Sequence, residues 1–558
     1  MLLLYALFLI FPLFIHQLLF WLNGYGVKMF HILPVMNDEV SWWSQINAML
    51  THGNPLGYYG YNGTHAPVGT SGPWGIAPLL PYVLYGKIFG WHLHSMAYAN
   101  ILFLSISVFV FCLLAKPDRK QLKWIFIVYA CSFLTIGYSL TAMSEGMRYA
   151  VGVVLIGIVV WLRENAPEIR KLSIKFIIIY LVIIAALVYA INVYLIFALA
   201  SMLIAWFMLK GMKPWLRAIL SILFTLICAL VSFKMTARYI APYTVSTINT
   251  LLEVLRDQGG YKAFCALFNG TLKNLLSVGI FNTIHQDTEI VQLFVITYNA
   301  VLVLTTVFFV RHLFIKKRQK ASGSLFVEMF SGNAFLVIFL LLGFVVGYAA
   351  LYTGSYWTLC RGINTGLLMA FLLIAMGEWK AEADPIHFNL IRVIVLAMSV
   401  FSIATIWSYL QSNVIERYES MERIPVIEAE KAALGEVFEI GPDKDAWDNT
   451  IAHYGEIDNF YLALPDAAGL NSLSDEVMNT EARYVIYRTS VWPEYHEKYE
   501  EMLKESGHGR IYEDDLFIVY ERGVEDKIKV PERKEAGEET EDSEEAEDSA
   551  DSEADADA

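Results

Sequence analysis

Two adjacent carboxylates, Asp38 and Glu39, follow the very apolar first 22 residues of this 558-residue chain. A carboxylate at a boundary between membrane and water, close to Trp42 and Trp43, can act as a general base or bind a divalent cation. Adjacent side chains do not point the same way on a regular helix, so one carboxylate could face a cavity while the other orients a neighbour. The alternative is a solvated helix end with interfacial tryptophans.

Further ionisable residues are predicted at the same boundary. Glu145 and Arg148 are three residues apart and share one helix face, so they either face a cavity or form a simple intrahelical ion pair. Arg361 stands where another apolar run begins, and it could hold a phosphate in forked geometry or extend to the membrane interface. Arg238 offers a second cationic site, and His65 lies in the first long loop.

The composition is that of a polytopic membrane protein rather than a large soluble enzyme. Hydrophobic residues make up 56% of the chain, charged residues only 17%, and the mean hydropathy is +0.46. The first 22 residues lack the features of a cleaved signal and are long enough to span a bilayer, which predicts a retained helix. Apolar runs predict about eleven transmembrane helices at 2–22, 96–115, 124–142, 147–162, 176–191, 193–209, 218–233, 290–310, 329–352, 362–378 and 388–409.

Lys- and Arg-rich short loops predict the orientation of these spans. All of them fall on one side if the N-terminus is cytoplasmic, in agreement with the positive-inside rule. They are KPDRKQLK (116–123), RENAPEIRKLSIK (163–175), KGMKPWLR (210–217) and RHLFIKKRQK (311–320). Residues 1–410 would then form a transmembrane domain with a large outer loop at 23–95, and the C-terminus would lie outside.

The C-terminal part changes in composition to that of a small α/β extracytoplasmic domain over 411–530. Strands are predicted at 460–465, 482–489 and 515–522, and helices at 424–438 and 494–504. No catalytic constellation is visible in it, which favours a covering or acceptor-binding role. Residues 531–558 are predicted to be a disordered acidic tail, because like charges without aromatics cannot build a core.

Together these features resemble the GT-C superfamily of integral-membrane glycosyltransferases. The superfamily includes protein O-mannosyltransferases, the aminoarabinose transferases of lipid A and many bacterial cell-envelope enzymes. The resemblance lies in the acidic pair after the first span, the loop THAPVGTSGPWGIAPLLPYVLYGKIFGW (64–91), Glu145, Arg361, and an outer domain containing WDNTI (447–451) and YLALP (461–465).

The resemblance implies transfer of a sugar from a polyprenyl-phosphate donor to an acceptor in the cell envelope, with inversion at the anomeric carbon. The acceptor would be a wall polymer, a glycolipid or a protein. Some members use Mg²⁺ or Mn²⁺, which Asp38 and Glu145 would hold here. The remaining roles implied are general base for Asp38, loop orientation or cation sharing for Glu39, acceptor or metal binding for Glu145 and His65, and phosphate binding for Arg361, Arg148 and Arg238.

Two other functions stay open from the sequence. A transporter or flippase of envelope lipids would need polar or broken spans near the midplane, whereas the charges here cluster at the outer boundary. A non-enzymatic surface scaffold would leave the boundary carboxylates unexplained. All three hypotheses place the chain in a cell membrane, in contact with lipid, and we expect a bacterial source and no nucleic-acid partner.

Overall fold

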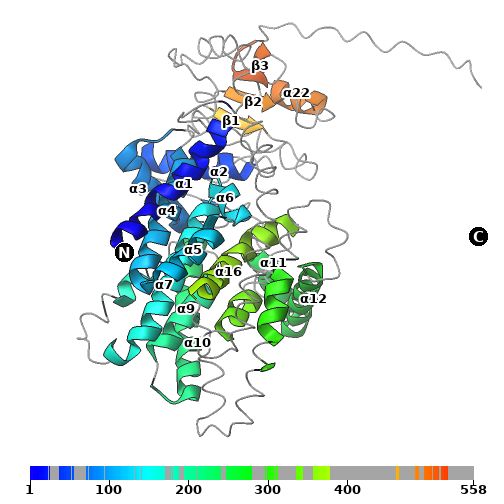
Figure 1. The fold of residues 1–558 in the computed structure, drawn as a ribbon. Helices are drawn as coiled ribbons and strands as arrows, with labels where there is room; N and C mark the ends of the chain where they lie inside the picture. The colour runs from blue at the N-terminus through cyan, green and yellow to red at the C-terminus, as the bar shows by residue number, and fades with distance from the viewer. Residues whose placement is uncertain are drawn as a thin grey trace, which may run out of the picture.

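The computed structural model shows a helical body with a small β-sheet at one end (Figure 1). It describes residues 1–22, 24, 37–51, 53, 55, 71–72, 75–92, 95–130, 132–139, 141–169, 178, 180–185, 187, 194–209, 211–239, 247–278, 296, 298–307, 310–311, 335–343, 356–376, 460–463, 484–488, 496–505, 507–513 and 517–525. His65, the predicted span at 388–409, the predicted helix at 424–438 and the acidic tail lie outside the described residues.

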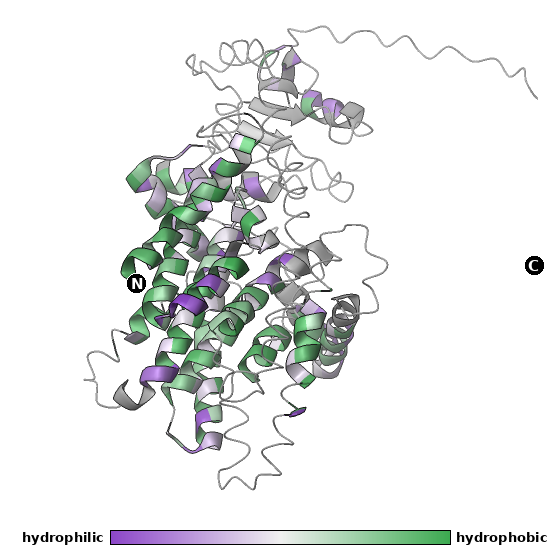
Figure 2. Ribbon diagram, viewed as in Figure 1, coloured by the Kyte–Doolittle hydropathy of each residue, from purple (hydrophilic) through white to green (hydrophobic). Residues whose placement is uncertain are grey.

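The helical body follows the apolar runs of the sequence. Its helices are α1 (Leu2–Leu22), α2 (Asn37–Thr51), η1 (Ala77–Leu79), α3 (Leu80–Phe89), α4 (Ser95–Ala115), α5 (Arg119–Ala130), α6 (Phe133–Ser139), α7 (Glu145–Ile169), α9 (Tyr194–Met208), α10 (Pro214–Tyr239), α11 (Thr247–Gln258), α12 (Gly260–Val278) and α16 (Tyr356–Met376). Shorter helical stretches cover 298–307 and 335–343. Hydrophobic residues dominate the long helices of this body, such as α1, α4 and α7 (Figure 2).

Within the described ranges, three helical stretches are long and apolar enough to cross a membrane: Ser95–Ala115, Glu145–Asn165 and Pro214–Thr236. Shorter apolar stretches run over Leu2–Ile15, Ala198–Met208, Tyr298–Val307 and Arg361–Met376. The predicted polytopic helical class is therefore confirmed in its coarse form. The predicted number of eleven spans is not tested, because several of the runs fall partly or wholly outside the described residues.

The central helix is α7, which packs against α4 on one side and α16 on another. In its apolar stretch 83% of the residues are buried, against 18% in that of α10, so α10 is peripheral. Two glycines permit the close packing of α7. A Cβ on Gly152 would lie 2.5 Å from Thr365 of α16, and one on Gly157 would lie 3.2 Å from the backbone of Phe111 in α4. Small residues at such crossings let membrane helices approach closely.

The structure corrects two of the predicted spans. The apolar run 124–142 forms two short helices, α5 and α6, instead of one. The Ser132 hydroxyl lies 2.6 Å from that of Thr135, so the second helix starts with a local polar contact of the kind that competes with helix continuation. The short span predicted at 147–162 is instead 25 residues long, from Glu145 to Ile169.

Hydrogen bonds join residues from distant parts of the chain at each end of the helical body. At one end, the Tyr5 hydroxyl donates to the carbonyl of Pro117, and the Gln121 side chain donates to the carbonyl of Met376. All four residues belong to the predicted cytoplasmic side. At the other end, the segments predicted to lie outside contact one another around the first turn of α7.

A four-stranded sheet forms the C-terminal part of the described chain. It contains β1 (Phe460–Ala463), β2 (Tyr484–Arg488), β3 (His508–Glu513) and β4 (Phe517–Arg522) in the order β1-β2-β4-β3, with only β1 and β2 parallel. The helix α22 (His496–Glu505) packs against β3. Three strands and this helix lie where the sequence predicts them, and β3 was not predicted. The sheet lies at the same end of the molecule as α2 and α6 (Figure 1). The boundaries 411–530 and the extracytoplasmic location stay predictions.

Candidate active site

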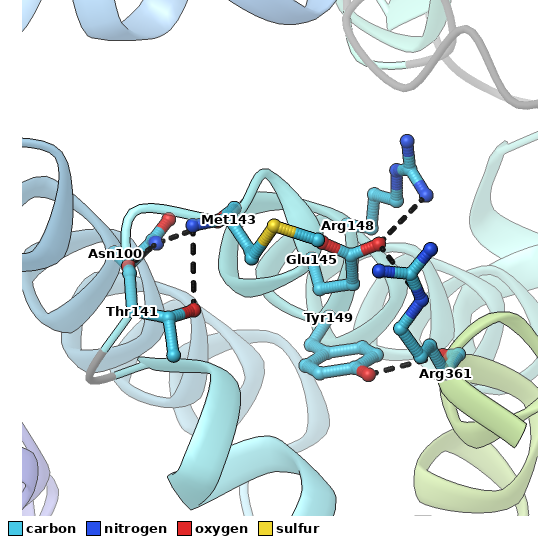
Figure 3. Close-up of polar contacts among 7 residues, drawn as sticks. All are labelled: Asn100, Thr141, Met143, Glu145, Arg148, Tyr149 and Arg361. Atoms are coloured by element: carbon cyan, nitrogen blue, oxygen red, sulfur yellow. Dashed lines mark hydrogen bonds and ion pairs between the residues drawn. The ribbon is translucent and has the colours of Figure 1, made fainter. Parts of the chain in front are cut away.

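A buried charge cluster lies where α7 begins. The carboxylate Oε1 of Glu145 is 3.3 Å from Nη1 of Arg148, one turn further along α7, and 3.8 Å from Nε of Arg361 in α16 (Figure 3). The side chains of Glu145 and Arg148 are 4% and 8% exposed, and that of Arg361 is 16% exposed. The contact between Glu145 and Arg148 is thus more than an intrahelical pair, and Arg361 is held inside the protein instead of extending to the interface.

Two further features of this cluster are a hydrogen bond from Tyr149 and the second carboxylate oxygen of Glu145. The Tyr149 hydroxyl donates to the backbone carbonyl of Arg361 at 3.0 Å, which ties the first turns of α7 to α16. The second carboxylate oxygen of Glu145, Oε2, is buried and accepts no hydrogen bond from the part of the chain that the structure describes. A buried carboxylate oxygen of this kind is costly unless a donor pairs with it.

Asn100 of α4 fixes the turn that leads into α7. Its amide nitrogen donates to the carbonyls of Thr141 and Met143, at 3.0 and 2.8 Å (Figure 3). Its Oδ1 accepts from the Tyr82 hydroxyl of α3 at 2.6 Å. A Cβ on Gly146 would lie 2.6 Å from the Asn100 side chain, so the turn can pack here only because residue 146 is glycine.

The Tyr82 hydroxyl is kept in its protonated form. Burial of the side chain raises the pKa of Tyr82 above its usual value near 10, and the negative charge of Glu145 raises this pKa further. The hydroxyl therefore remains a donor to Asn100 over the whole physiological pH range.

The acidic pair is held against the same turn. Glu39, which is fully buried in α2, accepts a hydrogen bond on Oε1 from the backbone N–H of Ala142 at 3.2 Å. Ala142 precedes Glu145 by three residues, so α2 brings the acidic pair to the charge cluster. Asp38 is the residue before Glu39 in this helix, and its side chain lies outside the described part. For Glu39, the alternative of a solvated helix end is wrong.

The tryptophans after the pair are core residues and not interfacial anchors. Trp42 packs with Tyr82 and Ala142 in a separate small core between α2, α3 and α4. Trp43 is 2% exposed, and its indole N–H donates to the carbonyl of His92 at 3.0 Å. These contacts explain why an aromatic sequence follows the acidic pair: it packs α2 onto α3.

Residues 71–72 of the predicted outer loop 23–95 connect α2 to the end of α10. Gln45 of α2 accepts from the backbone N–H of Gly72 at 3.2 Å. The Ser71 backbone N–H and hydroxyl both donate to the carbonyl of Tyr239, the last residue of α10. Arg238, a predicted phosphate ligand, is exposed and lies over the Tyr239 ring at 5.8 Å. It belongs to the same end of the molecule, with no contact to Glu145.

The described residues do not fit a metal ion at Glu145. No group of three His, Cys, Asp or Glu side chains comes together within the described ranges. The Glu145 carboxylate already faces two guanidinium groups, whose positive charges would oppose a divalent cation. The side chain of Asp38, the other predicted metal ligand, lies outside the described part.

Sequence reasoning missed Asn100, Tyr82 and Tyr149 as residues that position the site. Asn100 stands alone in a long apolar helix, and a polar side chain at such a position in a membrane span is a known signal for a functional contact. Tyr82 and Tyr149 gave no comparable signal, since tyrosine is common in interfacial segments.

The chain has structural matches among known proteins but no sequence match. No family model matches the chain, and no curated protein matches it. Its fold is similar to that of ArnT from Cupriavidus metallidurans bound to undecaprenyl phosphate, with 9% identity and a TM-score of 0.47 over 92% of this chain and 97% of that one. It is also similar to the Archaeoglobus fulgidus oligosaccharyltransferase in complex with Zn and sulfate, with 12% identity and a TM-score of 0.40 over 93% and 73% of the two chains.

Both matches concern the fold alone. With identities of 9% and 12% and TM-scores below 0.5, no substrate, metal or residue role is transferred from them to this chain.

Proposed function

We propose that the chain is a glycosyltransferase that moves a sugar from a polyprenyl-phosphate donor to a hydroxyl acceptor in the cell envelope. The observation that carries the proposal is the convergence of the acidic pair and the charge cluster. Glu39 contacts the turn at Ala142, and three residues later Glu145 gathers Arg148 and Arg361. A transferase of this kind needs a carboxylate base close to cations that stabilise a phosphate leaving group.

The two arginines are suited to a phosphate. A guanidinium has five N–H donors in a planar fork, a geometry that matches the oxygens of a phosphate. Arg148 and Arg361 come from different helices and meet at one carboxylate, so their guanidinium groups are oriented before a ligand arrives. The three side chains together carry a net charge of +1, which favours an anionic ligand. In this proposal Glu145 orients the arginines, and its Oε2 accepts a hydrogen bond from a substrate hydroxyl.

The two members of the acidic pair have different roles. The Glu39 carboxylate is buried and bonded to the backbone of Ala142, so it positions α2 relative to the turn. Asp38 is then the general base. It takes the proton of the acceptor hydroxyl, whose oxygen forms a bond to the anomeric carbon. The bond from that carbon to the phosphate oxygen breaks, and the oxygen keeps the electron pair, stabilised by Arg148 and Arg361. One displacement of this type inverts the anomeric centre.

The substitution Asp38→Asn tests the base directly. Asparagine keeps the size and polarity of the side chain but cannot take a proton at neutral pH. General-base catalysis contributes roughly 10²- to 10⁴-fold, so transfer measured in proteoliposomes with envelope lipids should fall by at least that lower factor. The matched control is Asp257→Asn, the same change at an exposed residue of α11. Full activity in Asp38→Asn would exclude Asp38 as the base.

A further inference from the structure

An apolar cavity lies at the opposite end of the helical body from the charge cluster. This cavity of about 620 Å³ is lined by side chains of α9, of the first residues of α10 and of the stretch 335–343, among them Trp206, Pro214, Ala218 and Phe339. Its volume is within the range of roughly 300–1,000 Å³ found for ligand pockets. The lining residues are almost all apolar, so the cavity suits a hydrocarbon chain.

Arg217 is buried beside this cavity. Its guanidinium carbon lies 3.6 Å from the centre of the Trp206 ring, a cation–π contact, and the residue is only 5% exposed. Two of its nitrogens, Nε and Nη2, are buried and donate no hydrogen bond to any residue in the described ranges. A buried guanidinium without an acceptor is costly, because its positive charge has lost water and gained no anion. The expected missing partner is an anion with several acceptor oxygens.

The location of the cavity indicates where such a ligand comes from. Most of α10 after Arg217 exposes large apolar side chains, including Ile219, Leu226 and Leu230, each more than half exposed. Such a surface on a membrane helix faces lipid. Trp215, which lines the cavity, is itself 61% exposed, and exposed tryptophans are typical of the level of the lipid headgroups. The cavity therefore adjoins the bilayer.

This site is distinct from the candidate active site. The far end of α10, at Tyr239, contacts Ser71 beside the active site. A helix of 26 residues spans about 39 Å, which exceeds the roughly 30 Å hydrocarbon thickness of a bilayer. Arg217 consequently lies at the opposite membrane surface, at the end of the Lys- and Arg-rich loop 210–217. Basic pockets between membrane helices on the cytoplasmic side are typical sites for anionic lipid headgroups.

We propose that Arg217 and the adjoining cavity bind one anionic membrane phospholipid. The headgroup phosphate accepts hydrogen bonds from Nε and Nη2 of Arg217, and an acyl chain occupies the apolar cavity between α9, α10 and the stretch 335–343. The lipid site is independent of the proposed glycosyltransferase site, because it uses no residue of the Glu145 cluster.

Native mass spectrometry of the full chain, after exchange into detergent with phosphatidylglycerol or with phosphatidylcholine of the same acyl chains, tests the site. The unmodified protein should retain one phosphatidylglycerol in preference to phosphatidylcholine. Arg217→Gln should lower this retention about tenfold or more, since hydrogen bonds to charged groups are worth some 1.5–3 kcal/mol. The matched control Lys213→Gln removes an exposed positive charge one turn earlier, and it should leave retention unchanged.

Two further measurements complete the test: a variant that fills the cavity and a competition with inorganic phosphate. Ala218→Trp fills the cavity and leaves Arg217 in place, so it should also abolish retention of the lipid even if Arg217→Gln folds poorly. Inorganic phosphate in excess should not displace the lipid if the acyl chain contributes to binding. The proposal is overturned by unchanged retention in either Arg217→Gln or Ala218→Trp, by an equal loss in Lys213→Gln, or by full displacement with inorganic phosphate, which would indicate a headgroup site alone.

Discussion

Glu39 and Ala142 are separated by 103 residues, and a hydrogen bond of 3.2 Å joins the Glu39 carboxylate to the Ala142 backbone N–H. This bond places the acidic pair of α2 beside the start of α7, the helix that carries Glu145, Arg148 and Tyr149. The proposed base and the proposed phosphate ligands therefore depend on one buried contact. Its removal should disturb both the fold and the reaction.

Glu39→Ala should destabilise the protein by about 1–3 kcal/mol, because the Ala142 N–H is left buried without an acceptor. Glu39→Gln should lose less, since the amide oxygen can still accept this bond. The measurement is thermal unfolding of both variants in the same detergent, followed by transfer activity. Equal stability of Glu39→Ala and the unmodified protein would show that the contact does not hold α2 in place.

Glu145→Ala should be among the most destabilising single changes at the site. It removes the carboxylate that faces the buried Arg148, and removal of one partner from a buried ion pair costs about 3–5 kcal/mol. Glu253→Ala, an exposed carboxylate of α11, is the control and should change stability little. If Glu145→Ala loses no more stability than the control, water reaches the cluster and the three side chains are not buried.

Gly146→Ala should destabilise the start of α7, since the new methyl group would lie within 2.7 Å of three Asn100 side-chain atoms. Gly270→Ala offers the opposite case, because a methyl group at this position of α12 would have open space within 4 Å. Alanine is better than glycine inside a helix by roughly 0.5–1 kcal/mol, so the second change should raise the unfolding temperature. Shifts of the same sign in both variants would contradict the close contact between α7 and Asn100.

Tyr149→Phe removes the hydroxyl that donates to the Arg361 carbonyl, and little else. The expected cost is about 1 kcal/mol of stability, the usual net worth of a neutral hydrogen bond. Since Arg361 is then less well fixed, the KM for the lipid-linked donor should rise more than kcat falls. An unchanged KM together with reduced kcat would place Tyr149 in the chemical step instead.

Much of this site could be predicted from local patterns. Hydropathy located α1, α4, α9 and α16, and the spacing of Glu145 and Arg148 predicted their shared helix face. The positive-inside rule predicts a side for each loop from charge alone, and this topology stays a prediction.

Other features depend on tertiary packing, which spacing does not encode. No pattern distinguishes Glu39, bound to a backbone N–H in another part of the chain, from Asp38 beside it. The apolar run 124–142 has no proline, and its one glycine, Gly137, lies inside α6 and not at the break before Phe133. Hydropathy therefore predicts one helix through the break. Asn100 was overlooked because its three partners come from two other segments.

The most direct test of the central claim is mass spectrometry of lipids that co-purify with the unmodified protein, Asp38→Asn and Arg361→Gln. We expect a polyprenyl-phosphate sugar on the unmodified protein, its accumulation in Asp38→Asn, where binding persists without transfer, and its loss from Arg361→Gln. No polyprenyl lipid in any sample, with no binding of added sugar lipid, would contradict a lipid-linked donor and favour a transporter or a surface scaffold.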